Sequence, residues 1–147
     1  MTIKFYKVKD KYGCFSNFSR HEFHLKGRLW TTSEHYFQAQ KFIGTKYEEE
    51  IRLTKTAIEA AKKGRDRNKP LRADWENVKD IVMYQAVKRK FETHKNIREI
   101  LLSTCEQQII ENSPSDYYWG CGKDGSGKNM LGIILMEVRD FFNQENI

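Results

Sequence analysis

The 147-residue sequence has few cysteines and prolines and lacks any long apolar run. Its three cysteines are an odd, widely spaced set without a CxxC pair, so they predict no complete disulfide framework and fit a reducing compartment. Only two prolines, with 31% charged residues, argue against a fibrous or disordered chain. No stretch approaches the roughly 20 apolar residues of a membrane span. With no signal peptide visible at the start, we expect a soluble protein of the cytoplasm, or of the host cytoplasm if a virus encodes it.

Motifs for metals and nucleotides are incomplete. His21 and His24 form an H-x-x-H pair, but no cysteine or carboxylate cluster near them completes a zinc site. The segment from Gly122 to Asn129 nearly matches the phosphate-binding pattern GxxxxGK[ST], yet Asn129 stands where that pattern has a magnesium-binding hydroxyl. We therefore expect neither an NTPase nor any metal or other cofactor.

What the sequence does have is positive charge and aromatic rings. Lysine and arginine exceed aspartate and glutamate by 26 to 20, for a net charge of +6, and aromatic residues make up 13%. Such a balance favours anionic partners, either phosphorylated small molecules or nucleic acid. Much of the excess lies in the run from Lys62 to Lys69, although a solvated helix face explains such a run equally well.

Hydrophobic periodicity predicts an α+β fold that is mainly helical. A strand is expected from Ile3 through Phe5 toward Val8, a hairpin over residues 22–30 with its turn at Gly27, and a brief strand over 108–111. Five helices are expected over residues 31–42, 47–63, 74–93, 96–101 and 130–142. With no internal repeat or linker, residues 1–147 are expected to form a single domain.

One predicted helix carries a line of polar residues. Glu34, Gln38 and Lys41 share a face at i, i+4 and i+7, an arrangement that suits an oxygen-rich, phosphate-bearing ligand. A structural alternative is stronger on spacing alone: residues 31–34 have the S/T-x-x-E form of a capping box, in which Glu34 only closes the helix start.

Two further segments are candidate binding elements. In Arg72-Ala73-Asp74-Trp75, the tryptophan can stack on a base and the arginine can pair with phosphate, but an N-cap aspartate beside a packing tryptophan is common. The loop from Ser113 to Gly122 holds an acid, three aromatics and two glycines, a composition typical of ligand-binding loops. Within it, a carboxyl group beside apolar rings, Asp116, suits a general acid. The glycines before Asn129 can also present backbone N–H groups to a phosphate, with a tight turn equally favoured.

Together these segments resemble one family. The motifs occur in the order Gly13-x-Phe15-Ser16-Asn17-Phe18, Ser33-Glu34-His35-Tyr36-Phe37-Gln38-Ala39-Gln40-Lys41-Phe42, Leu71-Arg72-x-Asp74-Trp75-x-x-Val78-Lys79, Ser113-Pro114-x-Asp116-x-x-Trp119-Gly120 and Gly127-x-Asn129-x-Leu131-Gly132. This set resembles the NADAR family, also called YbiA-like N-glycosidases, over nearly the whole chain.

The resemblance implies hydrolysis of an N-glycosidic bond between ribose and a base. It places the family's catalytic glutamate, tryptophan and aspartate at Glu34, Trp75 and Asp116. It also implies that a larger set lines the substrate site: Phe15, Ser16, Asn17, Phe18, Gln38, Lys41, Arg72, Trp119, Gly120, Lys128 and Asn129. One carboxylate would stabilise an oxocarbenium-like state and activate water while the other protonates the departing base; sequence does not decide which does which.

The resemblance leaves the substrate open. Family members of this layout are linked to ribosylaminopyrimidine phosphates, which are intermediates of riboflavin biosynthesis, and others release ADP-ribose from guanine, including guanine in DNA. A non-catalytic module that binds ADP-ribose or a related phosphate is the third alternative. The paired acids favour the enzymes, and the positive charge slightly favours DNA as a partner.

Overall fold

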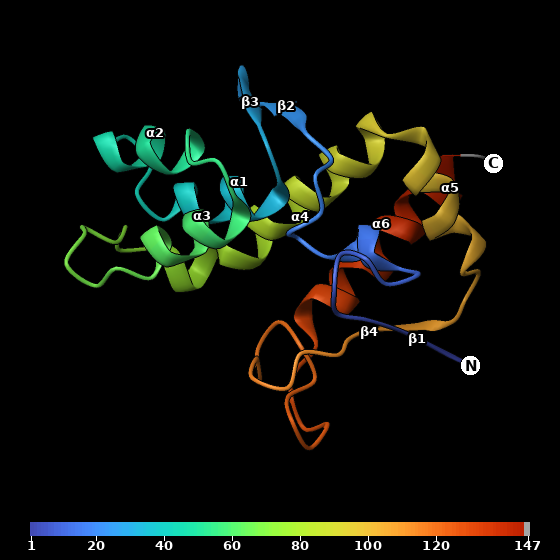
Figure 1. Cartoon of the computed structure of the whole chain (residues 1–147). Coiled ribbons are helices and arrows are strands. Elements are labelled where there is room, and N and C mark those ends of the chain that lie inside the picture. The colour runs from blue at the N-terminus through green and yellow to red at the C-terminus, as the bar shows by residue number, and fades with distance from the viewer. Residues whose placement is uncertain (146–147) are drawn as a thin grey trace. The chain divides into compact units, whose positions relative to one another are not determined.

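A computed structural model describes residues 1–145, and its backbone contacts divide the chain into two compact units. Among the described residues, the terminal unit consists of residues 1–19 and 91–145, and the central unit consists of residues 20–90. Residues 1–145 form six α-helices and four short strands, whose arrangement can be followed in Figure 1. The predicted α+β, mainly helical class is confirmed. None of the helices in residues 1–145 is long and apolar enough to cross a membrane.

The terminal unit is built on a parallel pair of strands. β1 (Thr2–Phe5) pairs with β4 (Gln108–Glu111), with Ile3 opposite Ile109. Helix α6 (Met130–Glu145) packs against β4, and α5 (Lys95–Ser103) packs against α6. The expected extension of β1 toward Val8 is wrong, because the chain turns there: the carboxylate of Asp10 accepts the N–H of Lys7.

The central unit begins with the predicted hairpin of β2 (Phe23–Leu25) and β3 (Arg28–Trp30). Its two-residue turn has positive φ at both Lys26 (55°) and Gly27 (76°), which is the requirement of a type I′ turn. The cross-strand pair Phe23 and Trp30 is buried, and the Trp30 indole N–H donates to the Leu25 carbonyl at 3.0 Å. The hairpin therefore has an apolar face that packs into this unit.

The predicted helix over residues 47–63 is two helices, so the expected number of five is one short. α2 (Lys46–Arg52) and α3 (Ala57–Gly64) are separated because Thr56 caps α3, with its hydroxyl accepting the N–H of Glu59. The break turns Ile58 outward, where it is exposed, and α3 packs through its alanines instead. α4 (Trp75–Thr93) follows; its last three residues belong to the terminal unit.

Helix α1 (Ser33–Gln40) is buried on every side, with all eight residues in the interior. It packs against α2 and α3. Its N-cap is Thr32, whose hydroxyl accepts the N–H of His35. A cap at Thr32 places Glu34 in the second helical position, whereas the expected capping box from Thr31 needs it in the third. The capping-box explanation of Glu34 is therefore wrong.

Candidate functional site

The polar residues of α1 are unusual because they lie in the protein interior. Burial of polar groups is costly unless they are hydrogen-bonded. His35 contacts the Thr32 hydroxyl at 2.7 Å and the Thr54 carbonyl at 3.0 Å. Burial lowers the pKa of His35, with the Thr54 hydrogen bond opposing that shift. His35 is thus accounted for as a structural residue that ties α1 to the segment after α2.

Glu34 is another buried polar residue of α1. Its side chain is only 7% exposed, and its Oε2 accepts a 2.7 Å hydrogen bond from the amide Nε2 of Gln38, one helical turn later. Gln38 in turn packs against the end of α3: a Cβ added at Gly64 would lie 1.9 Å from its Oε1. Only glycine at position 64 leaves room for this amide, which holds the carboxylate of Glu34.

Lys41 extends the same line beyond the end of α1. Its Nζ donates to the Gly64 carbonyl at 3.2 Å and lies 5.9 Å from the centroid of the Trp75 ring. Burial lowers the pKa of Lys41; Glu34 opposes this shift, while Arg65 and Lys79 add to it. The structure therefore places Glu34, Gln38 and Lys41 along one side of α1, with Lys41 next to Trp75.

Trp75 is the first residue of α4 and is 5% exposed. Its ring packs on Phe37 with centroids 5.0 Å apart. Just before it, the guanidinium of Arg72 forms two hydrogen bonds with the carboxylate of Asp74, at 2.6 and 2.9 Å. Arg72 thus already holds a carboxylate, and its expected contact with phosphate requires exchange of that partner.

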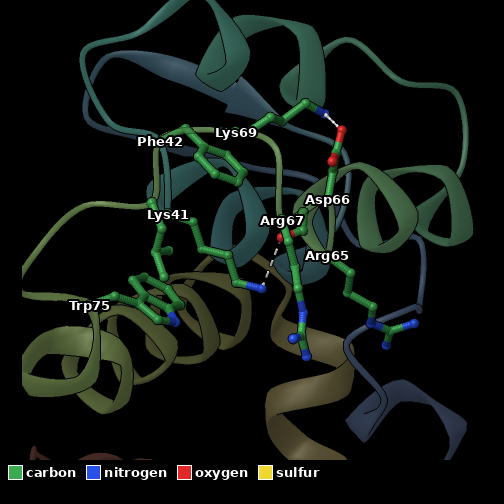
Figure 2. A pocket seen from close by; sticks show the side chains of 9 residues that line it. Lys41, Phe42, Arg65, Asp66, Arg67, Lys69 and Trp75 are labelled. Atoms are coloured by element: carbon green, nitrogen blue, oxygen red, sulfur yellow. Dashed lines mark hydrogen bonds and ion pairs between the residues drawn. The ribbon is translucent and has the colours of Figure 1, made fainter.

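A pocket of about 530 Å³ opens beside these residues (Figure 2). Its walls are Lys41 and Phe42 after α1, residues 64–67 at the end of α3, Lys69, Leu71 and Trp75. The expectation drawn from sequence included only Lys41 and Trp75 of this set. Residues 64–67 and Lys69 belong to the basic run over residues 62–69, whose sequence does not show whether it faces solvent or a pocket.

In the terminal unit, Asp116 organises the aromatic loop. Its Oδ1 accepts the backbone N–H groups of Tyr118 at 3.0 Å and Trp119 at 2.8 Å. The rings of Tyr118 and Trp119 meet edge to face, with centroids 4.8 Å apart, and the Lys128 ammonium lies 5.5 Å from the Tyr118 ring. Asp116 and Trp119 are therefore in contact, and Lys128 lies over the Tyr118 ring beside them.

The glycines of the loop before Asn129 use their N–H groups within the protein. The backbone N–H groups of Gly125, Gly127 and residues 128–131 donate to carbonyls of the loop over residues 117–122, and that of Ser126 donates to Asp124. The amide of Asn129 also bridges to β4, accepting from Glu111 N–H and donating to the Ile109 carbonyl, both at 2.9 Å. Of the two alternatives left open for this loop, these hydrogen bonds favour the tight turn, because the loop and the start of α6 use each other's polar groups.

The segment from Phe15 to Phe18 has mixed surroundings. Phe15, in the short 3-10 helix η1 (Gly13–Phe15), is 1% exposed and contacts Phe5 and Tyr12, so it is part of the terminal unit's core. The Ser16 hydroxyl accepts the N–H of Phe18, and both Ser16 and Asn17 are buried, whereas Phe18 is half-buried. Gly120, another residue of the expected substrate site, is also buried, and a Cβ added there would lie 3.0 Å from the Glu111 carbonyl oxygen. The polar residues of this segment remain candidates, whereas Phe15 has a core position.

Comparison with known proteins identifies the family. The NADAR domain model matches residues 4–143, which is nearly the whole chain. The chain belongs to the NADAR family. This NADAR chain is 51% identical to N-glycosidase YbiA of Escherichia coli (strain K12) over 94% of its length and 86% of that protein. It is also 51% identical to N-glycosidase Npun_R5314 of Nostoc punctiforme, over 95% of this chain and 92% of that protein.

A solved structure confirms the NADAR fold. The NMR structure of Escherichia coli YbiA superposes with a TM-score of 0.92 at 48% identity, covering 99% of this chain and 89% of that one. Taken with the two curated relatives, the match establishes the activity class of this NADAR chain: it is a hydrolase that acts on N-glycosyl compounds.

Proposed function

We propose that this N-glycosidase hydrolyses the bond between ribose and the amino-pyrimidine of a ribosylaminopyrimidine phosphate. The observation that carries the proposal is the buried carboxylate of Glu34, which Gln38 holds by a hydrogen bond and which interacts electrostatically with Lys41, a wall of the cation-lined pocket that also includes Trp75. Two relatives support the substrate class. One is riboflavin biosynthesis protein PYRR of Zea mays, 43% identical over 93% of this chain and 24% of that protein. The other is riboflavin biosynthesis protein VVA0006 of Vibrio vulnificus, 36% identical over 94% of this chain and 38% of that protein.

In the proposed reaction, the bond from ribose C1′ to nitrogen breaks and its electron pair stays on the nitrogen. Glu34 stabilises the positive charge that develops on the ribose and takes a proton from the attacking water, whose oxygen bonds to C1′. Asp116 supplies the proton to the departing base. General acid or base assistance of this kind contributes about 10²–10⁴-fold to the rate. The opposite assignment of the two carboxyl groups uses the same atoms and is tested below.

Trp75 and the polar residues around the carboxylate have supporting roles in the proposal. The indole gives the pocket a flat apolar wall, suited to a ribosyl or pyrimidine ring. Gln38 restricts the carboxylate to one orientation through its 2.7 Å hydrogen bond. Asn17, Phe18 and Trp119 are proposed to contact the ribose, and Lys128 to contact an anionic part of the substrate.

The test compares wild-type protein with Glu34→Gln in the presence of a chelator, on ribosylaminopyrimidine phosphate and on DNA carrying ADP-ribosylated guanine. The isosteric amide still accepts from Gln38, so folding is preserved while the charge is lost. We expect turnover of the first substrate, reduced about 10²–10⁴-fold in the variant. Glu50→Gln, an exposed carboxylate of α2, is the matched control. Wild-type activity in Glu34→Gln would contradict the assignment.

The pH dependence of the Glu34→Gln and Asp116→Asn variants separates the two carboxyl groups. Loss of the general base removes the acidic limb of the rate profile, and loss of the general acid removes the alkaline limb. If Asp116→Asn loses the acidic limb, the roles are exchanged.

DNA carrying ADP-ribosylated guanine is the second candidate substrate, favoured by the net charge of +6 and the exposed lysines of the basic run. A DNA-acting enzyme weakens steeply with salt, by about one log unit per phosphate contact for each log unit of salt. A flat salt response on the DNA substrate would exclude it. Tight ADP-ribose binding without turnover of either substrate would instead indicate a binding module.

A further inference from the structure

The pocket lined by Lys41 and Trp75 has more positive than negative charge. Lys41, Arg65, Arg67 and Lys69 line it, and Asp66 is its single carboxylate. Lys69 lies 3.8 Å from Asp66, donates to the Lys63 carbonyl at 3.1 Å and sits over the ring of Tyr47. Figure 2 shows the Lys69 and Asp66 pair turned toward each other, away from Lys41. The carboxylate in the pocket is therefore used by Lys69 and does not neutralise the two arginines.

Arg65 and Arg67 differ from the other arginines of the chain. The sequence has nine, and seven of them donate side-chain hydrogen bonds to protein oxygens: Arg20, Arg28, Arg52, Arg72, Arg89, Arg98 and Arg139. Within residues 1–145, the guanidinium groups of Arg65 and Arg67 alone have no hydrogen-bond or ion-pair partner. Two neighbouring unpaired guanidiniums at a pocket wall are an arrangement that an anion would complete.

Backbone hydrogen bonds hold the segment that carries these two arginines. The N–H of Arg65 donates to the carbonyls of Ala61 and Lys62 at the end of α3. Asp66 N–H donates to the Lys63 carbonyl, and Asp66 Oδ1 accepts Asn68 N–H at 2.9 Å. The turn is thus fixed by its own main chain, and the two guanidiniums are left to a ligand.

Lys41 is the third cation considered at this pocket wall. In Figure 2 the side chains of Lys41, Arg67 and Arg65 extend toward the lower part of the view, with Arg65 farthest to the right and the Trp75 ring beside Lys41. Arg65 is close enough to help lower the pKa of Lys41. Like charges held together without an anion repel one another, and a bound phosphate reverses the sign of that interaction.

We propose that Arg65 and Arg67, aided by Lys41, bind the phosphate group of the substrate, and that Trp75 and Phe42 contact the sugar next to it. The inference rests on the proposed function for the identity of the sugar. The ligand class is a phosphate ester at the ribose 5′-oxygen, which ribose 5-phosphate represents as a monoester and ADP-ribose as a diphosphate. This site differs from the one expected at the start of α6, where the N–H groups are already used.

The experiment measures binding, not turnover. Ribose 5-phosphate, ADP-ribose and unphosphorylated ribose are titrated calorimetrically into wild-type protein and into Arg65→Ala, Arg67→Ala and Arg67→Lys. Loss of either guanidinium is expected to weaken the affinity for the phosphorylated ligands about 10- to 100-fold, because charged hydrogen bonds are lost. Arg67→Lys should recover only part of the affinity, since it keeps the charge but loses the two-pronged geometry. The ligand with the larger loss identifies the monoester or the diphosphate as the natural group.

Lys62→Ala is the matched control, because Lys62 belongs to the same basic run and is exposed without lining the pocket. It should leave binding unchanged. Equal weakening by Lys62→Ala and Arg67→Ala would overturn the proposal in favour of a diffuse charge effect, and so would unchanged binding in both arginine variants. Activity with arginine-insensitive binding would leave the N-glycosidase proposal standing without this site. Arginine-dependent binding without turnover would support the site and count against the reaction.

Discussion

The close packing of Gly64 against Gln38 makes Gly64→Ala a sharp test of how the site is built. A Cβ at position 64 would lie 1.9 Å from Oε1, 2.6 Å from Cδ and 2.8 Å from Cβ of Gln38. The first two atoms can move by rotation of the side chain, at the cost of the hydrogen bond to Glu34. The third cannot, because it is fixed to α1, a helix buried on every side.

The Cβ–Cβ separation of 2.8 Å is about 0.6 Å short of the 3.4 Å at which ordinary contact begins, so α1 and α3 must move apart. Forcing an extra methyl into a packed interior costs about 1–3 kcal/mol. Alanine recovers only about 0.5–1 kcal/mol through its better helix propensity. The difference spans about 0–2.5 kcal/mol. Because α1 is buried on every side and leaves little room to relax, we expect net destabilisation of about 1–2 kcal/mol, together with a loss of activity larger than the loss of stability explains.

Urea unfolding measures the stability change, with Lys63→Ala as the control on the exposed neighbouring position. In the double variant Gly64→Ala/Gln38→Ala, the clashes with Oε1 and Cδ disappear and the Cβ contact remains. The double variant should therefore recover part of the stability but not the activity. A Gly64→Ala protein as stable as wild type, or more so, would refute the reasoning, because helix propensity alone would then account for the result.

Three further predictions concern buried polar groups. Burial, with Glu48 nearby, raises the pKa of Tyr36 to about 12 from 10, so Tyr36 ionises first in the unfolded chain. The free energy of unfolding should therefore fall by up to about 2–3 kcal/mol as the pH rises from 10 to 12. Unfolding followed by circular dichroism should show a smaller fall in Tyr36→Phe. Burial lowers the pKa of His35, so its contribution to stability is present above pH 6.5 and is lost as the pH falls below that value. If wild type loses no more stability than His35→Gln when the pH is lowered, this explanation is wrong. Asn129→Ala removes the two hydrogen bonds to β4 and leaves the Glu111 N–H and the Ile109 carbonyl without this partner. Each lost partner costs about 1–3 kcal/mol where water does not reach the group, so the midpoint of thermal unfolding should fall. An unchanged midpoint would show that water replaces the amide.

Elements with strong local signals could be predicted from the sequence. The hairpin followed from Lys26-Gly27 between apolar residues, and the strand over residues 108–111 was also confirmed. The break between α2 and α3 was missed although Thr56 and Glu59 have the spacing of a cap, because the apolar pattern continued across it. A local hydrogen bond outweighed periodicity at this point.

Prediction of the site divided in a similar way. The line of Glu34, Gln38 and Lys41 could be drawn from helical spacing, but spacing favoured a capping role for Glu34 until the cap proved to be Thr32. The role of Arg65 and Arg67 could not be predicted, because a basic run has the same sequence whether it faces solvent or a pocket. Their positions depend on where α3 ends and on how its last residue packs against α1.

The pairing of β1 with β4 has a consequence for the order in which the chain folds. The two strands are joined only after residues 108–111 have left the ribosome, whereas residues 20–90 form a contiguous unit that is complete long before. Contacts so distant in sequence form slowly, because a long loop must close first. We expect the central unit to collapse early around α1 while the N-terminal strand waits unpaired, so that a chain stalled before residue 108 would present the bare edge of that strand to chaperones.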